Sequence, residues 1–245
     1  MNIYELSHIG EFHVNHNEDF KVVADLGKQF KLIAVMDGCS SGTDSHLAST
    51  LIGKILRKLA KQESYREFAE RTQFTIKEQL EKVSLNLFSE LQTINRHLDL
   101  ERDEILSTAI IGVVDIENFQ AEFIIIGDGV IHIDGETIEY ENDNKPDYIG
   151  YHLKMDKQEW FEKQTQKKSV STFKDLSIST DGIHTFKNFD GKSYKTIEPN
   201  EIAQQFFSDR QFENSENKLK KTLIKLKEEY GLLPSDDLTI IRVMS

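Results

Sequence analysis

Short apolar runs of strand length and longer amphipathic segments occupy separate blocks of this chain. Lys21–Asp25 and Phe30–Met36 are rich in β-branched and aromatic residues and flank Gly27, a pattern that is typical of a β-hairpin. From Leu47 to Leu59 the apolar residues instead recur every three or four positions, which indicates one buried face of a helix. Because strands and helices come in blocks rather than in strict alternation, we predict an α+β layered sandwich and not an alternating parallel-sheet fold.

The rest of the chain repeats these two patterns. Leu80–Leu98 and Leu219–Tyr230 are predicted helices, and Gly231 stands where a left-handed C-cap belongs. Polar, turn-rich residues predict loops at Glu141–Asp147 and Lys187–Lys195. The remaining predicted strands are Ser107–Asp115, Gln120–Ile126, Val130–Asp134, Thr137–Tyr140, Lys174–Thr180 and Leu238–Met244.

The composition limits the size of this fold and its partners. With 245 residues, of which 38% are hydrophobic, the chain is long enough for one domain with a real core. We therefore expect residues 1–245 to form a single domain, and we expect a monomer. A formal net charge of −12 argues against nucleic acid and against an anionic membrane surface as partners, since both are bound by clustered Lys and Arg.

The sequence also predicts a cytoplasmic location. The single cysteine, Cys39, cannot form an internal disulfide, which favours a reducing compartment. The first residues lack a basic segment followed by a long apolar one, as a secretory signal would have. No apolar run approaches the ~18 residues that are needed to span a bilayer.

Acidic residues stand where the predicted strands begin or end. Those that follow or precede such a strand are Asp19, Asp37, Asp128, Asp181 and Asp236. An Asp-Gly pair alone is ordinary turn chemistry, because Asp bonds the nearby backbone and Gly supplies a positive φ. As a set, however, strand ends in a layered sheet converge on one edge, where so many carboxylates cannot all stay ionised without a cation. Hard oxygen ligands of this kind select Mg²⁺ or Mn²⁺.

The same positions carry a resemblance to a known family. In order along the chain, the segments NED, AVMDGCSSGTDSHLAS, STAIIGVVD, IIIGDGVIHI, LSISTDGI and SDDLTIIRV resemble the motifs of the metal-dependent type 2C serine/threonine protein phosphatases, the PPM family. Each motif is weak alone, but together they follow the family's order across essentially the whole chain. The resemblance implies a four-layer α-β-β-α sandwich, in which two packed antiparallel sheets are flanked by helices and metal ions lie at one end.

The resemblance also implies roles for individual residues. The implied metal ligands are Glu18, Asp37, Gly38, Asp128, Asp181 and Asp236. Asp37 would bridge two Mn²⁺ or Mg²⁺ ions, and Gly38 would offer its carbonyl oxygen to one of them. Asp128 together with Asp181 would hold a weak third ion. Asp19 would orient a water, so that Asp37 and Asp19 are the predicted catalytic residues.

The implied activity is the hydrolysis of phosphoserine and phosphothreonine monoesters by a water that a binuclear Mg/Mn centre activates. The implied partners are phosphoprotein substrates, either a Ser/Thr kinase or its targets. A cysteine nucleophile is not required, and Cys39 lies outside any Cys-x5-Arg phosphate-binding signature.

The sequence departs from the family pattern where substrate phosphate is expected. Many relatives carry an arginine shortly before the first acidic pair, whereas SHIGEFHVNHNED contains no Arg or Lys. His13 is our candidate substrate-binding residue, with His8 and His16 as the other available imidazoles; each is also compatible with an ordinary surface or core histidine. Thr185 stands where relatives often have a second aspartate, which would weaken a third metal site.

Other interpretations are compatible with the residues. The missing arginine leaves room for a catalytically weak or inactive phosphatase-like module that binds a phosphoprotein. A Ca²⁺-binding structural domain is a further alternative, although no DxDxDG loop supports it. Lys154–Lys168 is either a short substrate-side flap or an ordinary helix that buries Trp160 and Phe161. Cys39 is interpreted as a buried small residue rather than a redox sensor.

Overall fold

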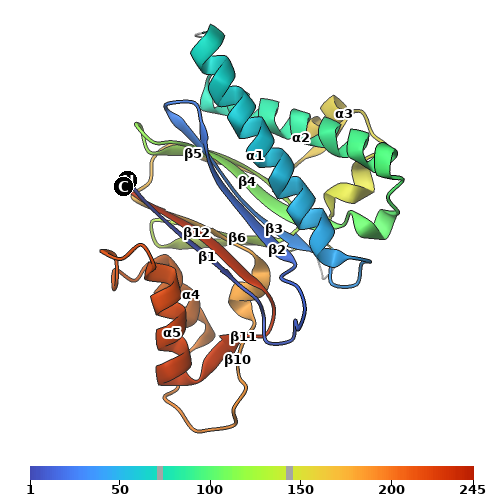
Figure 1. Cartoon of the computed structure of the whole chain (residues 1–245). Helices are drawn as coiled ribbons and strands as arrows, with labels where there is room; N and C mark the ends of the chain where they lie inside the picture. Colours follow the sequence, from blue (N-terminus) through green and yellow to red (C-terminus); the bar gives the residue numbers. More distant parts are fainter. Residues whose placement is uncertain (71–73, 142–145) are drawn as a thin grey trace.

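The computed structural model describes residues 1–70, 74–141 and 146–245 of the chain. Within them, two five-stranded antiparallel sheets pack face to face, and helices cover both outer faces (Figure 1). This arrangement confirms the predicted α+β sandwich with four layers, α-β-β-α. Residues 142–145 of the predicted loop Glu141–Asp147 lie outside the described residues.

The longer helices cover one of the two sheets. Its strands, in spatial order, are β2 (Asp19–Leu26), β3 (Phe30–Gly38), β4 (Ser107–Asp115), β5 (Gln120–Ile126) and β8 (Lys167–Val170). The helices over it are α1 (Ser45–Glu70), α2 (Ile76–Leu98) and α3 (Lys157–Lys163). Helix α1 crosses β2 and β3 diagonally, while α2 packs over β4 and β5 (Figure 1).

The second sheet contains both the first and the last strand of the described chain. Its strands, in spatial order, are β1 (Asn2–His8), β12 (Leu238–Met244), β9 (Asp175–Ser179), β6 (Gly129–Ile133) and β7 (Glu136–Tyr140). The helices α4 (Pro199–Phe207) and α5 (Lys218–Tyr230) cover its outer face (Figure 1). The short strands β10 (Phe186–Asn188) and β11 (Leu232–Pro234) pair with each other, and single 3-10 turns occur at η1 (Arg102–Glu104), η2 (Ile149–His152) and η3 (Asp181–His184). The C-cap of α5 is Gly231 with φ +66°, as predicted.

Side chains along β3 point alternately to the two faces of its sheet and therefore contribute to two separate hydrophobic cores. Ile33 and Val35 lie in the core between the sheets, whereas Leu32, Ala34 and Met36 lie in the core beneath the helices. All five are at most 1% exposed. Because a slip of one residue would exchange the two sets, burial on both faces fixes the register of β3 and therefore the position of the aspartate near its end.

The segment Lys154–Lys168 contains an ordinary amphipathic helix. Asp156 caps α3, since its carboxylate accepts hydrogen bonds from the backbone N–H groups of Gln158 at 2.8 Å and Glu159 at 3.2 Å. Trp160 is fully buried and stacks on Phe88 of α2, with 4.4 Å between the ring centroids. Packing against α2 thus accounts for this tryptophan, and the interpretation as a helix that buries it is confirmed.

The predicted strands and helices omit several short elements, namely β1, β8, β10, β11 and α4. Strand β1 buries only Tyr4 and Leu6 among its residues, too few for a clear alternating pattern. The predicted loop Lys187–Lys195 is wrong at its start, because Lys187 and Asn188 belong to β10 and pair with β11. In these places tertiary pairing outweighs local propensity.

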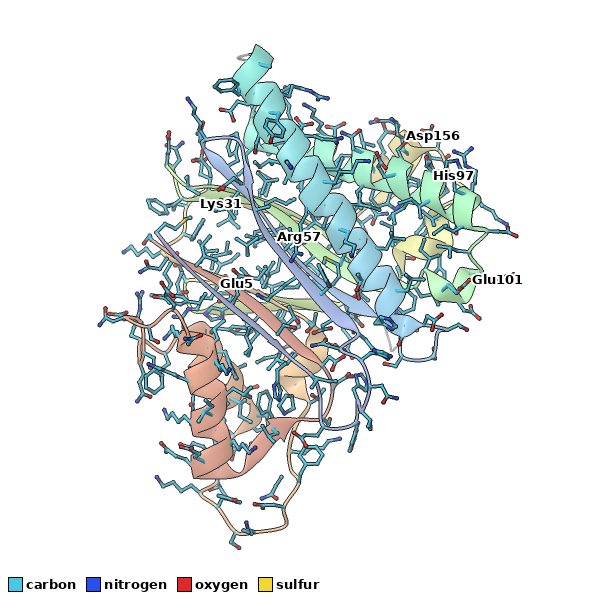
Figure 2. All side chains as sticks on the ribbon, viewed as in Figure 1. Glu5, Lys31, Arg57, His97, Glu101 and Asp156 are labelled. Carbon is cyan, nitrogen blue, oxygen red and sulfur yellow. The ribbon has the colours of Figure 1, made fainter. Side chains whose placement is uncertain are left out.

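Charged side chains lie at the edges of the layers. Glu101, His97 and Asp156, all exposed, lie along one edge of the outer helical layer (Figure 2). None of the helices in the described parts of the chain has the length and apolarity that a bilayer crossing requires.

Candidate active site

Aspartates from both sheets gather at one end of the sandwich. Asp19 opens β2 and Asp37 is the second-last residue of β3, and the antiparallel register places the two directly opposite each other. Asp128 lies between β5 and β6, Asp181 follows β9 and opens η3, and Asp236 precedes β12. The negative charges of the other four all raise the pKa of Asp37, so the fold brings the five carboxylates to the same end of the sandwich, within electrostatic range of Asp37.

Burial and mutual repulsion disfavour the charged forms of these carboxyl groups. Burial raises the pKa of Asp37 well above its ordinary value, and the neighbouring aspartates raise it further. Burial raises the pKa of Asp19 to about 8 and that of Asp128 to about 6, with Asp181 adding to both shifts. Burial, followed by the charge of Asp236, raises the pKa of Asp181. Ionising all of these carboxyl groups together is therefore unfavourable unless a cation joins them.

The two carboxylate oxygens of Asp19 differ in their hydrogen bonding. Its Oδ2 accepts a hydrogen bond from the Thr180 hydroxyl at 2.8 Å, whereas Oδ1 is buried and has no hydrogen-bond partner among the described residues. The backbone N–H of Asp19 donates to Asn17 Oδ1 at 2.9 Å, which fixes the start of β2. A buried acceptor without a donor is costly unless another group meets it.

The donor set fits a hard divalent cation. Carboxylate and carbonyl oxygens are the ligands of Mg²⁺ and Mn²⁺, and a cation would offset the repulsion within the cluster. In residues 1–70, 74–141 and 146–245, no three His, Cys, Asp or Glu side chains converge as a preformed ligand cage. A shell completed largely by water is consistent with this arrangement, since Mg²⁺ usually keeps several waters and takes one or two carboxylates.

Glu18 lies to one side, against the loop after β3. Its carboxylate accepts hydrogen bonds from the hydroxyls of Ser40, at 2.7 Å, and Ser45. Its backbone oxygen accepts from the N–H of Gly38 at 3.1 Å. A Cβ on Gly38 would lie 2.0 Å from the backbone oxygen of Ser45, so only glycine allows α1 to start this close to the end of β3.

Comparison with known proteins identifies this arrangement. Residues 10–226, most of the chain, match the family profile described as protein phosphatase 2C. The chain belongs to the protein phosphatase 2C family. Members of this family are metal-dependent serine/threonine phosphatases that act on phosphoproteins, and the chain is an enzyme of that class. A search of curated proteins found no match.

Solved structures share the phosphatase 2C fold at low sequence identity. A variant of a bacterial serine phosphatase, in which one arginine is replaced by alanine, is 14% identical with a TM-score of 0.62. The match covers 100% of this chain and 98% of that one. The serine/threonine phosphatase Stp1 of Staphylococcus aureus is 12% identical with a TM-score of 0.60, covering 99% and 94%. RsbX, solved in complex with magnesium, is 16% identical with a TM-score of 0.50, covering 98% and 92%.

Asp237 is a residue of this phosphatase 2C chain whose role the sequence analysis missed. It is 2% exposed, and its two oxygens accept hydrogen bonds from the backbone N–H groups of Gly10 at 2.7 Å and Glu18 at 2.5 Å. It therefore ties the segment between β1 and β2 to the start of β12. The sequence feature that could have pointed to this role is the pair of adjacent acids, Asp236 and Asp237.

His13, the predicted substrate-binding residue, lies against the same doublet. Its Nδ1 is 2.9 Å from Asp237 Oδ2 and its Nε2 is 3.5 Å from Asp236 Oδ1. Although burial lowers the pKa of His13, the hydrogen bond to Asp237 and the charges of both aspartates raise it overall. His13 therefore stands beside the acidic cluster, where an imidazolium is favoured.

A small pocket opens beside the cluster. Its volume is about 280 Å³, and among the residues that the structure describes its lining includes Asp128, Asp181, Glu139, His184 and Thr185 and no Arg or Lys. The Thr185 hydroxyl accepts a hydrogen bond from the Asp236 N–H at 3.2 Å. The residue that replaces the family's second aspartate thus helps to fix Asp236.

Cys39 follows the acidic strand end directly. It is half-buried rather than buried as predicted, and its Sγ lies 3.2 Å from Ser41 Oγ. Cys39 lines a second pocket, of about 400 Å³, together with Leu106, Tyr148 and Tyr151. Its partial exposure follows from the turn that the chain makes between β3 and α1.

Proposed function

We propose that this chain hydrolyses phosphoserine and phosphothreonine monoesters of proteins in a Mn²⁺- or Mg²⁺-dependent reaction with water. The carrying observation is the group of buried and half-buried aspartates around Asp37, because carboxylates that raise one another's pKa need a cation to stay ionised. Membership of the phosphatase 2C family supports the same reaction. The catalytically inactive binding module has no comparable support, since a scaffold has no need for a repulsive acidic cluster.

Two divalent ions are proposed to bind in this cluster, with a weaker third. The residues that would hold the first two are Glu18, Asp37, Gly38 through its carbonyl, Asp181 and Asp236, and Asp128 would join Asp181 for the third. Bound ions of this kind neutralise charge on the phosphoryl group and lower the pKa of a water towards neutrality.

The side chains of the protein are proposed to orient the reactants. Thr180 fixes Asp19 Oδ2, which leaves Asp19 Oδ1 to accept a hydrogen bond from the attacking water. His13 is proposed to face the substrate phosphate from its place beside Asp236. In the reaction the water oxygen forms a bond to phosphorus and the bond from phosphorus to the serine oxygen breaks. The serine oxygen takes up one proton from the water, and the other proton stays with the phosphate product.

The proposed substrates are phosphoproteins, either a Ser/Thr kinase or its targets. We propose a reducing, cytoplasmic setting, which the free thiol of Cys39 supports. We also propose that residues 1–245 act as one domain and as a monomer, supported by the continuous core between the two sheets.

The test is turnover of phosphoserine and phosphothreonine peptides by the full chain with Mn²⁺. We expect chelation to abolish turnover, and Asp37→Asn to lower kcat by about a thousandfold or more, because it removes the central carboxylate. Asp25→Asn is the matched control: it lies at the other end of β2 and pairs with Lys31 at the surface, so kcat should stay unchanged.

The outcomes separate the alternatives. Wild-type activity in Asp37→Asn would show that the metal ligands are assigned wrongly. Calorimetric binding of Mn²⁺ with no turnover of any phosphopeptide would favour the binding module instead.

A further inference from the structure

Exposed apolar side chains lie next to the acidic cluster. Phe12, in the segment between β1 and β2, is 64% exposed, and Phe189, just after β10, is 40% exposed. Their rings meet edge to face with 5.6 Å between centroids. Large apolar groups in contact with each other at the surface mark binding sites more often than isolated ones do.

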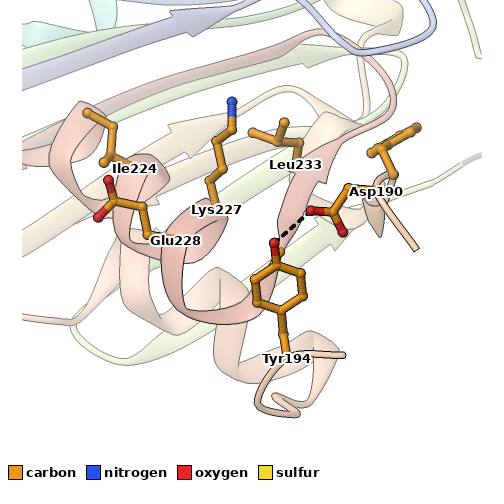
Figure 3. Close-up of a pocket in the computed structure, with 8 residues that line it drawn as sticks. Asp190, Tyr194, Ile224, Lys227, Glu228 and Leu233 are labelled. Carbon is orange, nitrogen blue, oxygen red and sulfur yellow. Dashed lines mark hydrogen bonds between the residues drawn. The ribbon is translucent and has the colours of Figure 1, made fainter. Parts of the chain in front are cut away.

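The second of these rings leads into a pocket of about 420 Å³ between the loop after β10 and helix α5 (Figure 3). Leu233, Ile224 and Tyr194 supply its apolar lining, and its charged lining residues are Lys227, Glu228 and Asp190. We call Phe12, Phe189, Tyr194, Ile224 and Leu233 together the apolar groove.

The loop that forms one wall of the groove is held in place by its own hydrogen bonds. Tyr194 donates from its hydroxyl to Asp190 at 2.6 Å (Figure 3). Asn188 Oδ1 accepts from the N–H groups of Asp190 at 3.1 Å and Gly191 at 2.9 Å. Gly231 allows the Tyr194 ring to lie against the end of α5, because a Cβ there would be 2.3 Å from the ring. A preformed wall of this kind lowers the entropic cost of binding.

The groove is continuous with the candidate active site. The N–H of Phe12 donates to the backbone oxygen of Ser235 at 3.0 Å, and the next residue, His13, contacts Asp236. Leu233 precedes Asp236 by three residues, and because the chain bends at Ser235 and Asp236 the two lie at most roughly 10 Å apart. An extended peptide with its phosphoserine at the aspartates would therefore reach the groove with a side chain about three residues away.

Charge and size favour a peptide as the occupant. Lys187 lies over the Phe12 ring, 5.1 Å from its centroid, and forms no ion pair within the described parts of the chain, unlike the nearby Lys192 and Lys195. Its ammonium offers a positive charge to an anionic phosphopeptide in a protein of net charge −12. The pocket suits one or two side chains, whereas a stable dimer buries about 800 Å² on each partner.

We propose that the apolar groove binds a large apolar side chain of the phosphoprotein substrate, about three residues from the phosphorylated residue. The groove thereby selects among phosphoserine sites according to the residue that flanks them. This inference rests on the proposed phosphatase activity.

The test uses phosphoserine peptides in a neutral Gly/Ala background, with one Phe placed at each position from four residues before to four after the phosphoserine. With the full chain and Mn²⁺, we expect Phe about three residues away on one side to raise kcat/KM about tenfold over Ala, mainly through KM, since a partly buried Phe contributes that much. This ratio should fall to about one in Phe189→Ala. It should persist in Phe68→Ala, which removes an aromatic ring that is 82% exposed on α1.

Each result decides the inference. Turnover of p-nitrophenyl phosphate with equal kcat/KM for every peptide would overturn the groove and leave the phosphatase activity standing. No Mn²⁺-dependent turnover even of p-nitrophenyl phosphate would overturn the proposed function, and this inference with it. A dimer in sedimentation that Phe189→Ala dissociates, without any peptide preference, would assign the groove to a second copy of the chain and contradict the proposal.

Discussion

The charged groups around Arg242, which is buried, and those around Asp37, which is half-buried, are arranged in opposite ways. Arg242 is fully buried, and Asp175 binds it bidentately at 2.9 Å and 2.6 Å. Its remaining amino group donates to the backbone oxygens of Phe206 and Asp209, which holds the end of α4 against the sheet. At the acidic edge, by contrast, the groups that shift the pKa of Asp37 are other aspartates.

The difference separates structural charge from functional charge. A buried ion pair with satisfied hydrogen bonds keeps its geometry without help from solution. A buried group of like charges is destabilising by itself and becomes favourable only when a cation joins it. The local structure is similar in the two regions, since each Asp lies at a strand end. The neighbouring charges, rather than the residue type, therefore distinguish a structural aspartate from a metal-facing one.

The largest effect on stability should come from breaking the balanced region. Asp175→Asn leaves Arg242 buried without its counter-charge, and we expect a loss of about 3–5 kcal/mol in the free energy of unfolding, measured by urea denaturation. Asp25→Asn, which removes an ion pair with Lys31 in which Asp25 is 72% exposed, should cost under about 1 kcal/mol. Equal losses in the two variants would contradict the contrast drawn between buried and exposed charge.

A smaller effect, on Mn²⁺ affinity, should follow from removing a hydrogen bond that holds the backbone next to the acidic cluster. Asp237→Asn removes one acceptor for the backbone of Gly10 or Glu18, and we expect Mn²⁺ affinity to fall about 10- to 100-fold in calorimetry. Asp134→Asn is the matched control, because Asp134 also accepts from two backbone N–H groups, at 2.9 Å and 2.8 Å, but follows β6 at the end opposite to Asp128. If both variants bind Mn²⁺ as the wild type does, Asp237 does not support the metal ligands.

The smallest effect is a dependence of stability on pH. The pKa of Asp19 is about 8 in the folded protein and near 3.8 in the unfolded chain, so the folded state binds the proton more tightly. Its contribution to stability is complete below about pH 4 and is lost as the pH rises towards 8. Without metal, we expect the melting temperature to fall by about 4 °C between pH 6 and pH 7, since one pH unit within this window costs about 1.4 kcal/mol.

Two comparisons sharpen this measurement. Saturating Mn²⁺ should reverse the slope, because metal binding favours ionised carboxylates. Asp19→Asn should make the slope without metal shallower, with the other raised aspartates left to titrate; an unchanged slope would mean that Asp19 does not carry the proton.

The residues at the acidic edge could be predicted because each stands beside a strong local pattern. Asp37 follows the buried run of β3, and Asp181 follows that of β9, so the alternation that fixes the register also fixes the aspartate. The two amphipathic helices α1 and α2 and the C-cap at Gly231 could be predicted for the same reason.

What could not be predicted depends on contacts between distant segments. The bond from Gly10 to Asp237 joins residues at opposite ends of the chain and leaves no periodic signal. Gly182 is required where η3 passes the start of β12, since a Cβ would lie 1.9 Å from the Asp237 backbone oxygen. Glycine alone in the sequence does not reveal which backbone approaches it.

The place of β12 has a consequence for the synthesis of the protein. Strand β12 lies inside its sheet, between β1 and β9, although it is the last described strand to leave the ribosome. Until it emerges, β1 and β9 have no common neighbour and Asp236 cannot join Asp37. Helices α1 and α2 can fold earlier over their own sheet, because domains form from the N-terminus onwards. A chain that stops before Asp236 is therefore expected to have no activity at all, rather than part of it.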